Sequence, residues 1–281
     1  MYIIFRISFM KTAFFTGATG GLGSLCVADL SETGNWTVFA AGTNQSRLTE
    51  LARLANVHSV TVDITSQESV LAAKAEILKY TDRLDAIVNF AGLTSFNSMI
   101  EGDCIAVTEQ LLAVNVMGTV RVNRVLFDLV YAARGRIINC SSEAGWMKSQ
   151  PFAAPYFLSK RAIEAYNDSL RRELICLGIP VIKIQPGSFE TGMTQGIRDR
   201  YECVLRDTKY YRAVLQRMKP LMDSELNRKN DPAQLIKALR HALESNHPRL
   251  QYRVGTGKLL ALMELLPDRV LDGIYRFFFK R

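Results

Sequence analysis

The cysteines and histidines of this 281-residue sequence are too few and too scattered to indicate a metal site or a disulfide framework. The five cysteines contain no Cys-x-x-Cys pair, and His58, His241 and His247 lie far apart. Zinc sites and small disulfide-bonded domains both need clustered ligands or paired cysteines. We therefore expect no metal. The odd number of thiols favours a reducing compartment, which predicts a cytoplasmic protein.

Long apolar runs and dense basic clusters are also missing. No uninterrupted apolar stretch reaches the roughly 18–20 residues that span a bilayer, so we expect no transmembrane helix. The apolar stretch 1–11 is short, contains Arg6 and runs into a strand, so it does not predict a free signal peptide. The formal net charge is +8, yet no Lys/Arg-rich run with interleaved aromatic residues occurs. We therefore expect no nucleic-acid partner.

What the sequence does contain is an alternation of short apolar strands and helices. No linker or internal repeat interrupts it, which predicts an α/β fold with a doubly wound parallel sheet in a single domain. We assign residues 1–256 to this domain, 188–230 to a substrate-covering segment, and 257–281 to an amphipathic helical tail. The expected strands are 11–15, 36–41, 58–62, 84–89, 136–140, 179–185 and 250–254. The expected helices are 21–33, 44–55, 67–80, 107–118, 120–133, 156–177 and 231–245.

A glycine-rich turn, Thr16-Gly17-Ala18-Thr19-Gly20-Gly21-Leu22-Gly23, follows the first strand and opens a helix. Glycines allow backbone N–H groups to approach a pyrophosphate, and the helix N-terminus favours its negative charge. A tight turn without a ligand is the alternative interpretation. The position between a strand and a helix favours a dinucleotide.

A serine pair and a Tyr/Lys pair lie around the fifth strand. Ser141 and Ser142 follow the strand 136–140, and Tyr156 and Lys160 come later in a predicted helix. Side chains at positions i and i+4 lie one turn apart on one helix face. An ammonium group beside a phenol stabilises the phenolate, so this pair could exchange a proton. Taken alone, a serine here would be a turn residue, the tyrosine a packing residue and the lysine a solvated residue. Together, these residues indicate acid/base chemistry.

Together, these motifs resemble the short-chain dehydrogenase/reductase family over residues 11 to about 194. Asn89-Phe90-Ala91-Gly92 is similar to the family's Asn-Asn-Ala-Gly, with Phe90 replacing the second asparagine. The turn also fits the family's longer, extended subclass through Gly17, Gly20 and Gly23, but the chain length and Ser142 favour the shorter one. The resemblance implies a cofactor-binding set: Gly17, Thr19, Gly21, Leu22, Gly23, Thr43, Arg47, Asp63, Ile64, Asn89, Ala91, Gly92, Tyr156, Lys160, Pro186, Gly187, Phe189 and Thr191.

The resemblance also implies the catalytic residues Asn115, Ser142, Tyr156 and Lys160. The reaction would be hydride transfer between nicotinamide and an alcohol or carbonyl carbon. Tyr156 would act as general acid/base, assisted by Lys160, which also binds the nicotinamide ribose. Ser142 would stabilise the substrate oxygen, and Asn115 would order a water, its alternative role being a helix-end cap. Ser141 is an alternative to Ser142, because the gap from Ser142 to Tyr156 is about one residue longer than usual.

The choice between NAD and NADP depends on the end of the second strand. Residues 40–47 contain no carboxylate that would repel a 2′-phosphate, and Thr43, Ser46 and Arg47 could bind one. Against this, Gly20 stands where many NADP-preferring relatives carry a basic residue. We favour NADP(H) over NAD(H).

The substrate is expected to be a small hydrophobic alcohol or carbonyl compound. Apolar residues of 188–230 indicate an apolar pocket: Met193, Tyr201, Tyr210, Tyr211 and Met218. The tail resembles those of family members that act on steroids and retinoids; it could contact a membrane peripherally, cover the pocket or join a second subunit. The family resemblance further implies a homodimer or homotetramer. The alternatives in function are an epimerase or dehydratase of the extended subclass and a non-catalytic, cofactor-binding regulator.

Overall fold

Seven parallel strands form one sheet at the centre of the molecule. The computed structural model describes residues 10–228 and 230–279. The expectation that the N-terminal stretch is not a free signal peptide concerns residues that lie mostly outside this part, as do Lys280 and Arg281 of the tail. The strand order is β3-β2-β1-β4-β5-β6-β7, with every neighbouring pair parallel. The predicted doubly wound parallel sheet is confirmed. The strands are β1 Lys11–Thr16, β2 Trp36–Gly42, β3 Val57–Thr61, β4 Ala86–Asn89, β5 Arg136–Cys140, β6 Val181–Pro186 and β7 Gln251–Val254.

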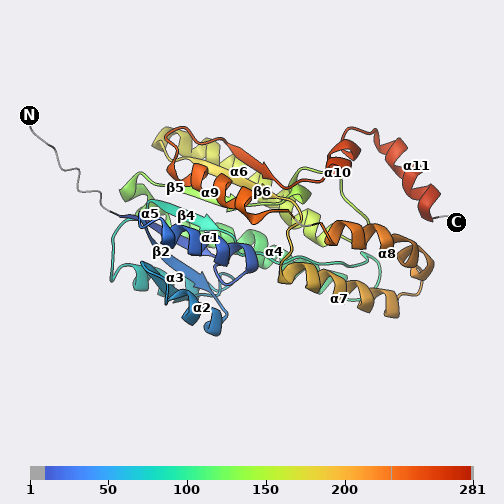
Figure 1. The fold of residues 1–281 in the computed structure, drawn as a ribbon, viewed down its shortest axis with the longest axis horizontal. Helices are drawn as coiled ribbons and strands as arrows, with labels where there is room; N and C mark the ends of the chain where they lie inside the picture. Colours follow the sequence, from blue (N-terminus) through green and yellow to red (C-terminus); the bar gives the residue numbers. More distant parts are fainter. Residues whose placement is uncertain (1–9, 229, 280–281) are drawn as a thin grey trace, which may run out of the picture.

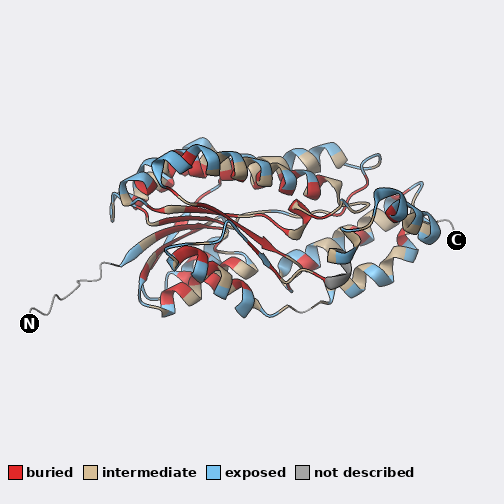
Figure 2. Cartoon of the chain, turned by 90° about the horizontal axis from the view of Figure 1, so that it is seen from above, coloured by how far each residue is buried: buried red, intermediate tan, exposed pale blue. Residues whose placement is uncertain are grey.

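Helices cover both faces of the sheet, and Figure 2 shows the buried strands between the two helical layers. Successive strand residues point to opposite faces. Phe14 therefore packs in the cluster under α3 (Gln67–Ile77), α5 (Thr119–Ala133) and α6 (Ala154–Leu174), whereas Phe15 packs in the cluster under α1 (Gly21–Glu32) and α9 (Pro232–Glu244). The layers also include α2 (Gln45–Leu51).

The two helices expected at 107–118 and 120–133 are one continuous helical run. It begins as α4 (Cys104–Leu112), passes through a π-helical segment η1 (Ala113–Gly118), and continues as α5. Widened turns of this kind inside α-helices are frequent at functional sites. Asn115 lies within this segment, so it is not the helix-end cap that the sequence left open.

The same run, Cys104–Ala133, is long and apolar enough to cross a membrane by length and composition alone. No such helix was expected from the sequence, because Arg121 and Arg124 interrupt the apolar run. In the fold, α5 buries Val122 and Leu126 in the core against the central sheet. Packing inside the domain therefore accounts for these residues of α5, whereas most of the run's apolar window is not buried.

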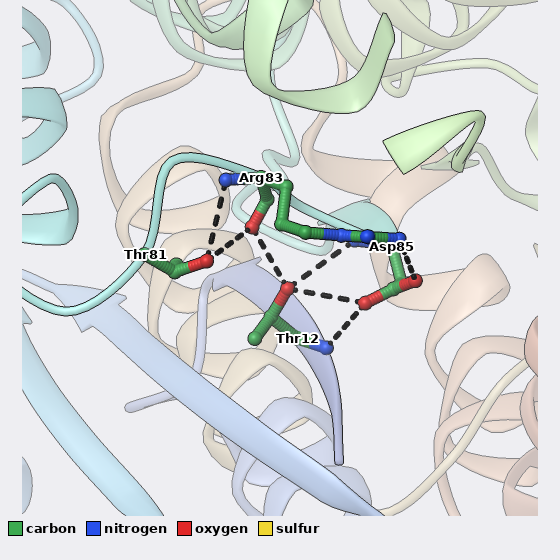
Figure 3. Close-up of polar contacts among 4 residues, drawn as sticks. All are labelled: Thr12, Thr81, Arg83 and Asp85. Atoms are coloured by element: carbon green, nitrogen blue, oxygen red, sulfur yellow. Dashed lines mark hydrogen bonds and ion pairs between the residues drawn. The ribbon is translucent and has the colours of Figure 1, made fainter. Parts of the chain in front are cut away.

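Polar contacts close the amino-terminal edge of the sheet, opposite the strand ends that carry the motifs (Figure 3). The Thr12 backbone N–H donates to Asp85 Oδ2 at 2.8 Å, and Thr12 Oγ1 donates to the Arg83 carbonyl oxygen at 2.9 Å. Thr81 Oγ1 donates to the same carbonyl oxygen at 3.1 Å. These groups satisfy one another, so the cluster fastens the loop before β4 onto β1.

Four helices extend beyond the carboxyl ends of the strands (Figure 1). The segment 188–230, expected to cover the substrate, forms α7 (Gly192–Asp207) and α8 (Arg212–Leu226). The C-terminal segment forms α10 (Lys258–Met263) and α11 (Asp268–Phe279).

The C-terminal helices are attached at two places. Arg217 on α8 donates to the Phe279 carbonyl oxygen at 3.0 Å. The Lys148 backbone N–H, in the loop before α6, donates to Glu264 Oε2 at 2.6 Å. The end of the chain therefore contacts both α8 and the loop that leads to Tyr156.

Candidate active site

The glycine-rich turn joins β1 to α1 and packs tightly on its neighbours. Gly17 has a left-handed φ of +70°, and a Cβ there would lie 2.5 Å from the Ala91 backbone nitrogen. A Cβ on Gly21 would lie 3.0 Å from the Thr191 side chain, and one on Gly23 would collide with the Gly17 carbonyl oxygen. No side chain caps the N-terminus of α1, so its first N–H groups are available to an anion. Such a bare backbone cradle fits a phosphate group.

The end of β4 lies directly beside this turn. The Ala91 backbone N–H donates to Thr16 Oγ1 at 3.3 Å. The Phe90 ring lies 5.1 Å from the Phe15 ring, in the hydrophobic cluster under α1 and α9. The phenylalanine that replaces the family's asparagine therefore fills an apolar layer and leaves the position of Ala91 intact.

Asn115, Gly92 and Lys160 come together on the other side of β4. Asn115 Nδ2 donates to the Leu93 carbonyl oxygen and to Ser159 Oγ, both at 2.9 Å, and its Oδ1 accepts from the Leu93 N–H at 2.7 Å. A Cβ on Gly92 would lie 3.3 Å from Asn115 Oδ1 and 3.6 Å from Lys160 Nζ. Because Gly92 has no side chain, the lysine and the asparagine lie beside the backbone at this point.

Tyr156 and Lys160 lie one turn apart on α6, as the sequence predicted. Lys160 Nζ lies 5.7 Å from the centre of the Tyr156 ring and donates to the Cys140 carbonyl oxygen at 3.2 Å. Lys160 is 6% exposed, and a buried ammonium needs such a partner. The Tyr156 hydroxyl bonds to no residue within 10–228 or 230–279, so it is available to a bound molecule.

The two serines after β5 have different surroundings. Ser142 Oγ accepts from the Ala144 N–H at 3.2 Å and caps a short 3₁₀ helix, η2 (Glu143–Gly145). Ser141 Oγ is buried and has no hydrogen-bond partner in the described part of the chain. A Cβ on Gly145 would lie 2.5 Å from Ser141 Oγ, so the Ser141 hydroxyl packs underneath η2.

Thr43 and Arg47 lie at the edge of the glycine-rich turn. Arg47 Nη1 donates to the Thr19 carbonyl oxygen at 3.1 Å, and a Cβ on Gly42 would lie 2.7 Å from Thr19 Oγ1. Asn44 caps α2 through the Arg47 N–H at 3.1 Å, as expected. The guanidinium group lies beside the turn, and both Arg47 and Thr43 are exposed.

Asp63 and Ile64 follow β3 and rest on the π-helical segment. Asp63 Oδ1 accepts from the Thr65 hydroxyl at 2.7 Å and from the Thr65 N–H at 2.8 Å, and these bonds lower the pKa of the carboxyl group. The Ile64 carbonyl oxygen accepts from Arg121 at 2.6 Å. A Cβ on Gly118 would lie 2.5 Å from Ile64 Cδ1. The loop is thus ordered, with an ionised carboxylate at its start.

Residues 186–191 connect β6 to α7 beside the glycine-rich turn. The Gly187 N–H donates to the Val254 carbonyl oxygen at 2.7 Å, and Phe189 is buried in the core. Thr191 Oγ1 accepts from the Met193 N–H at 3.3 Å and caps α7. The contact between Thr191 and Gly21 brings this segment to the start of α1.

Sequence reasoning missed Glu143, which directly follows Ser142. Burial raises the pKa of its carboxyl group to about 7; Arg228 opposes this rise and Glu225 adds to it. Glu143 Oε2 is buried with no hydrogen-bond partner among residues 10–228 and 230–279. Both charged neighbours are distant in sequence, so no local pattern could have identified the cluster.

The five residues expected to line an apolar pocket do not share one environment. Tyr201 is fully buried and donates to the Leu215 carbonyl oxygen at 2.8 Å, so it belongs to the core between α7 and α8. Met193 and Tyr210 are exposed. Met218 is half-buried, and Tyr211 packs on a residue outside 188–230.

That residue is Phe152, in the loop before α6. Its ring lies 5.1 Å from the Tyr211 ring and 5.5 Å from the Phe96 ring, which in turn contacts Tyr201. Phe152 has a φ of +60°, an uncommon conformation for a bulky residue. This aromatic cluster joins α7 and α8 to the loop that leads to Tyr156, and the sequence analysis did not identify it.

Comparisons with known proteins agree with this geometry. The family model described as short chain dehydrogenase matches residues 11–202. Retinol dehydrogenase 16 of Homo sapiens is 33% identical, covering 94% of this chain and 87% of the relative. 17-beta-hydroxysteroid dehydrogenase type 6 of Homo sapiens is 31% identical with the same coverage. A Burkholderia phymatum short chain dehydrogenase/reductase solved with NAD is 20% identical with a TM-score of 0.75, covering 94% of this chain and 95% of that one.

Proposed function

Because the chain belongs to the short-chain dehydrogenase family, we propose that it is an NAD(P)-dependent oxidoreductase acting on a hydrophobic alcohol or carbonyl compound. The observation that carries this proposal is the position of Lys160, which lies beside Tyr156, Gly92 and Asn115 at once. A bound nicotinamide cofactor would supply the hydride chemistry. The chain's own residues bind it and handle the proton.

Three groups of residues would hold the cofactor. The turn Gly17–Gly23 and the uncapped start of α1 accept the pyrophosphate. Ala91 lies beside this turn, Gly92 lies beside Lys160, and Thr191 closes the turn from the other side. The residues assigned to the adenosine end of the cofactor are Asp63, Ile64, Thr43 and Arg47. Those assigned to the nicotinamide end are Pro186, Gly187 and Phe189. Asn89 supports the end of β4.

Tyr156 is assigned the proton transfer to and from the substrate oxygen. Its hydroxyl is available, and the Lys160 ammonium beside it stabilises negative charge. Asn115 holds the Leu93 backbone next to the lysine and keeps this corner ordered. Ser142 is assigned the stabilisation of the substrate oxygen. The burial of the Ser141 hydroxyl under η2 supports Ser142 over Ser141 in this role.

We assign NADP(H) as the preferred cofactor. The guanidinium group of Arg47 lies at the edge of the glycine-rich turn, where it would attract a 2′-phosphate. Thr43 lies beside it, and residues 40–47 contain no carboxylate that would oppose this charge.

A lipophilic alcohol is the proposed substrate class. Two relatives that align over nearly the whole chain are named for retinol and for a hydroxysteroid. The helices α7 and α8 add an aromatic cluster next to the loop before Tyr156. An aromatic surface suits a hydrophobic ring or polyene better than a sugar.

The C-terminal tail is proposed to touch a membrane peripherally, from a cytoplasmic location. We treat 257–281 as an appendage of the domain 1–256. In α11, Leu271 is buried whereas Val270 and Phe278 are exposed, and Arg269 and Arg276 add positive charge. An amphipathic helix with exposed aromatic and basic residues is suited to an anionic lipid surface.

A homodimer or homotetramer is the proposed assembly. The helical run Cys104–Ala133 and α6 expose large apolar side chains: Ile105 is 72% exposed, Met117 51% and Leu158 46%. Apolar side chains gathered on neighbouring helices of one face are typical of subunit contacts.

The deciding experiment is a substrate panel with both cofactors, read by the absorbance of the reduced nicotinamide. Retinoid, steroid and long-chain alcohols are compared with small polar sugars. Turnover of the lipophilic alcohols is the expected result. Activity on the sugars alone would refute the substrate class, and conversion without net cofactor turnover would indicate an epimerase or dehydratase. Cofactor binding without any conversion would indicate a regulator.

A further inference from the structure

A row of buried polar side chains crosses the sheet just before the strand ends. The register pairs Thr16 with Asn89, Asn89 with Asn139, and Asn139 with Lys183, on four adjacent strands. All four residues are at most 7% exposed. The row lies on the face covered by α5 and α6, because each member lies two positions after a residue of the hydrophobic cluster on that face. Those residues are Phe14, Ile87, Ile137 and Val181.

Buried polar side chains inside a parallel sheet that is covered on both faces are unusual. Parallel strands covered on both faces are normally apolar throughout. An unpaired buried amide or ammonium group is costly, so most of these groups have directed partners; Asn89 Oδ1 has none in the described part of the chain. The partners of the row therefore show what it holds in place.

On β5 and β6 the partners lie on α6. Asn139 Nδ2 donates to Asn167 Oδ1 at 3.0 Å. Lys183 Nζ lies 2.7 Å from Glu164 Oε2 and 3.0 Å from Asp168 Oδ1. All three partners follow Lys160 by one or two helical turns, so this part of α6 rests on the sheet through directed bonds as well as apolar contacts.

Two successive residues of β5 hold α6. Asn139 binds Asn167 through its side chain, and Cys140 binds Lys160 through its carbonyl oxygen at 3.2 Å. The two helix residues are seven apart, which is about two turns or roughly 10 Å. Two fixed points at this spacing determine both the position of the helix along the strand and its rotation about its own axis. Apolar contacts alone would permit small shifts.

We propose that Asn139 and Asn167 are positioning residues, whose hydrogen bond sets the place of Tyr156 and Lys160 relative to Ser142. The inference rests on the proposed function. Neither asparagine is assigned a contact with substrate or cofactor; they act through α6. Asn89 extends the link to β4, because its Nδ2 donates to Asn139 Oδ1 at 2.9 Å.

The chain contains a matched control in Asn123 on α5. Asn123 is 3% exposed, and its Oδ1 accepts from Asn89 Nδ2 at 2.7 Å. Its Nδ2 donates to Tyr166 Oη at 3.1 Å and to Asn139 Oδ1 at 3.3 Å. It belongs to the same network, but its loss leaves the bond from Asn139 to Asn167 in place. A purely structural role would make the two asparagines equivalent.

The test compares Asn167→Leu, Asn123→Leu and Asn167→Asp in the full-length protein. Leucine keeps the volume and removes the bonds, whereas aspartate keeps an acceptor for Asn139. We expect Asn167→Leu to lower kcat at least tenfold with the KM for cofactor within twofold. Asn123→Leu should lower the melting temperature similarly but keep kcat within threefold, and Asn167→Asp should recover most of kcat. Equal kcat losses in the two leucine variants, or an unchanged kcat in Asn167→Leu, would overturn the proposal.

A second readout does not need activity. Hydrogen exchange should rise along 154–174 for Asn167→Leu. For Asn123→Leu it should rise mainly in 119–133, because on α6 that variant frees only the Tyr166 hydroxyl. If Asn167→Leu does not fold, Asn167→Ala serves in both measurements. The wild type and Tyr156→Phe are assayed in parallel. A wild type without turnover would refute the proposed function. In that case the hydrogen-exchange pattern still tests whether the asparagine pair anchors α6. A selective rise in 154–174 for Asn167→Leu supports the anchoring, and an equal rise in both segments refutes it.

Discussion

The ammonium nitrogen of Lys160 lies 5.7 Å from the centre of the Tyr156 ring, while its hydrogen bond reaches the last residue of β5. One lysine thus connects the helix that carries the tyrosine to the strand that leads to Ser142. The sheet therefore fixes where the ammonium group lies relative to the tyrosine ring.

Replacing Tyr156 by phenylalanine should lower kcat by about 10²–10⁴-fold, the range that positioned acid/base groups contribute. The hydroxyl has no structural partner among the described residues, so its loss should leave folding and cofactor affinity within about twofold. Steady-state kinetics and quenching of protein fluorescence by reduced cofactor measure the two quantities. Retained turnover would remove Tyr156 from the mechanism.

The two serines should respond differently to alanine. Ser142→Ala should lower kcat by about 10²–10³-fold, as loss of a donor to a developing oxyanion does. Ser141→Ala should change kcat less than about threefold, because the Ser141 hydroxyl is enclosed under η2. Parallel kinetics on one alcohol compare them, and the reverse ranking would transfer the role to Ser141.

Arg47→Gln should raise the KM for NADP(H) about tenfold and leave that for NAD(H) nearly unchanged. A charge-assisted bond to a 2′-phosphate is worth roughly 1.5–3 kcal/mol, and only NADP(H) carries that phosphate. Arg53→Gln is the control, since Arg53 is also exposed and lies just after α2. Equal effects on both cofactors would show that Arg47 does not read the phosphate.

Glu143→Gln should stabilise the protein at pH 8 and have little effect near pH 4. The pKa of Glu143 is about 7 in the fold, against about 4.3 in an unfolded chain. Between these values the folded state binds more protons, so wild-type stability falls as pH rises from about 4 to 7. Glutamine removes that loss of stability, which is at most about 4 kcal/mol at 1.36 kcal/mol per pKa unit.

Urea unfolding of both proteins at several pH values measures this effect. Glu225→Gln is the contrast, because Glu225 pairs with Arg228 at 2.8 Å and its removal should not stabilise the protein at pH 8. A stability difference between wild type and Glu143→Gln that does not change with pH would mean that Glu143 titrates normally.

The features predicted from sequence are those encoded locally. The turn Gly17–Gly23 and the Tyr156/Lys160 spacing lie within one strand-helix junction or one helix turn, so their geometry follows from their order. The parallel sheet followed from the alternation of apolar strands and helices, and the structure confirms it.

The features that sequence reasoning missed depend on contacts between distant segments. The charges of Arg228 and Glu225 influence the pKa of Glu143 although both residues are more than 80 positions away in sequence, at and just after the end of α8. The polar row exists only in the register of four strands, and each asparagine alone reads as a break in an apolar pattern. Tyr201 was placed in a pocket although it lies in the core, because apolar periodicity alone does not separate the two.

The contacts of the C-terminal helices predict what an inherited or engineered truncation of the chain would do to the structure. Arg217 binds the carbonyl oxygen of Phe279, and Glu264 binds the loop at Lys148, so the end of the chain secures two segments far apart in sequence. A late stop codon would spare every recognisable motif of the family. It would still release α8, and with it the part of the enzyme that is proposed to select the substrate.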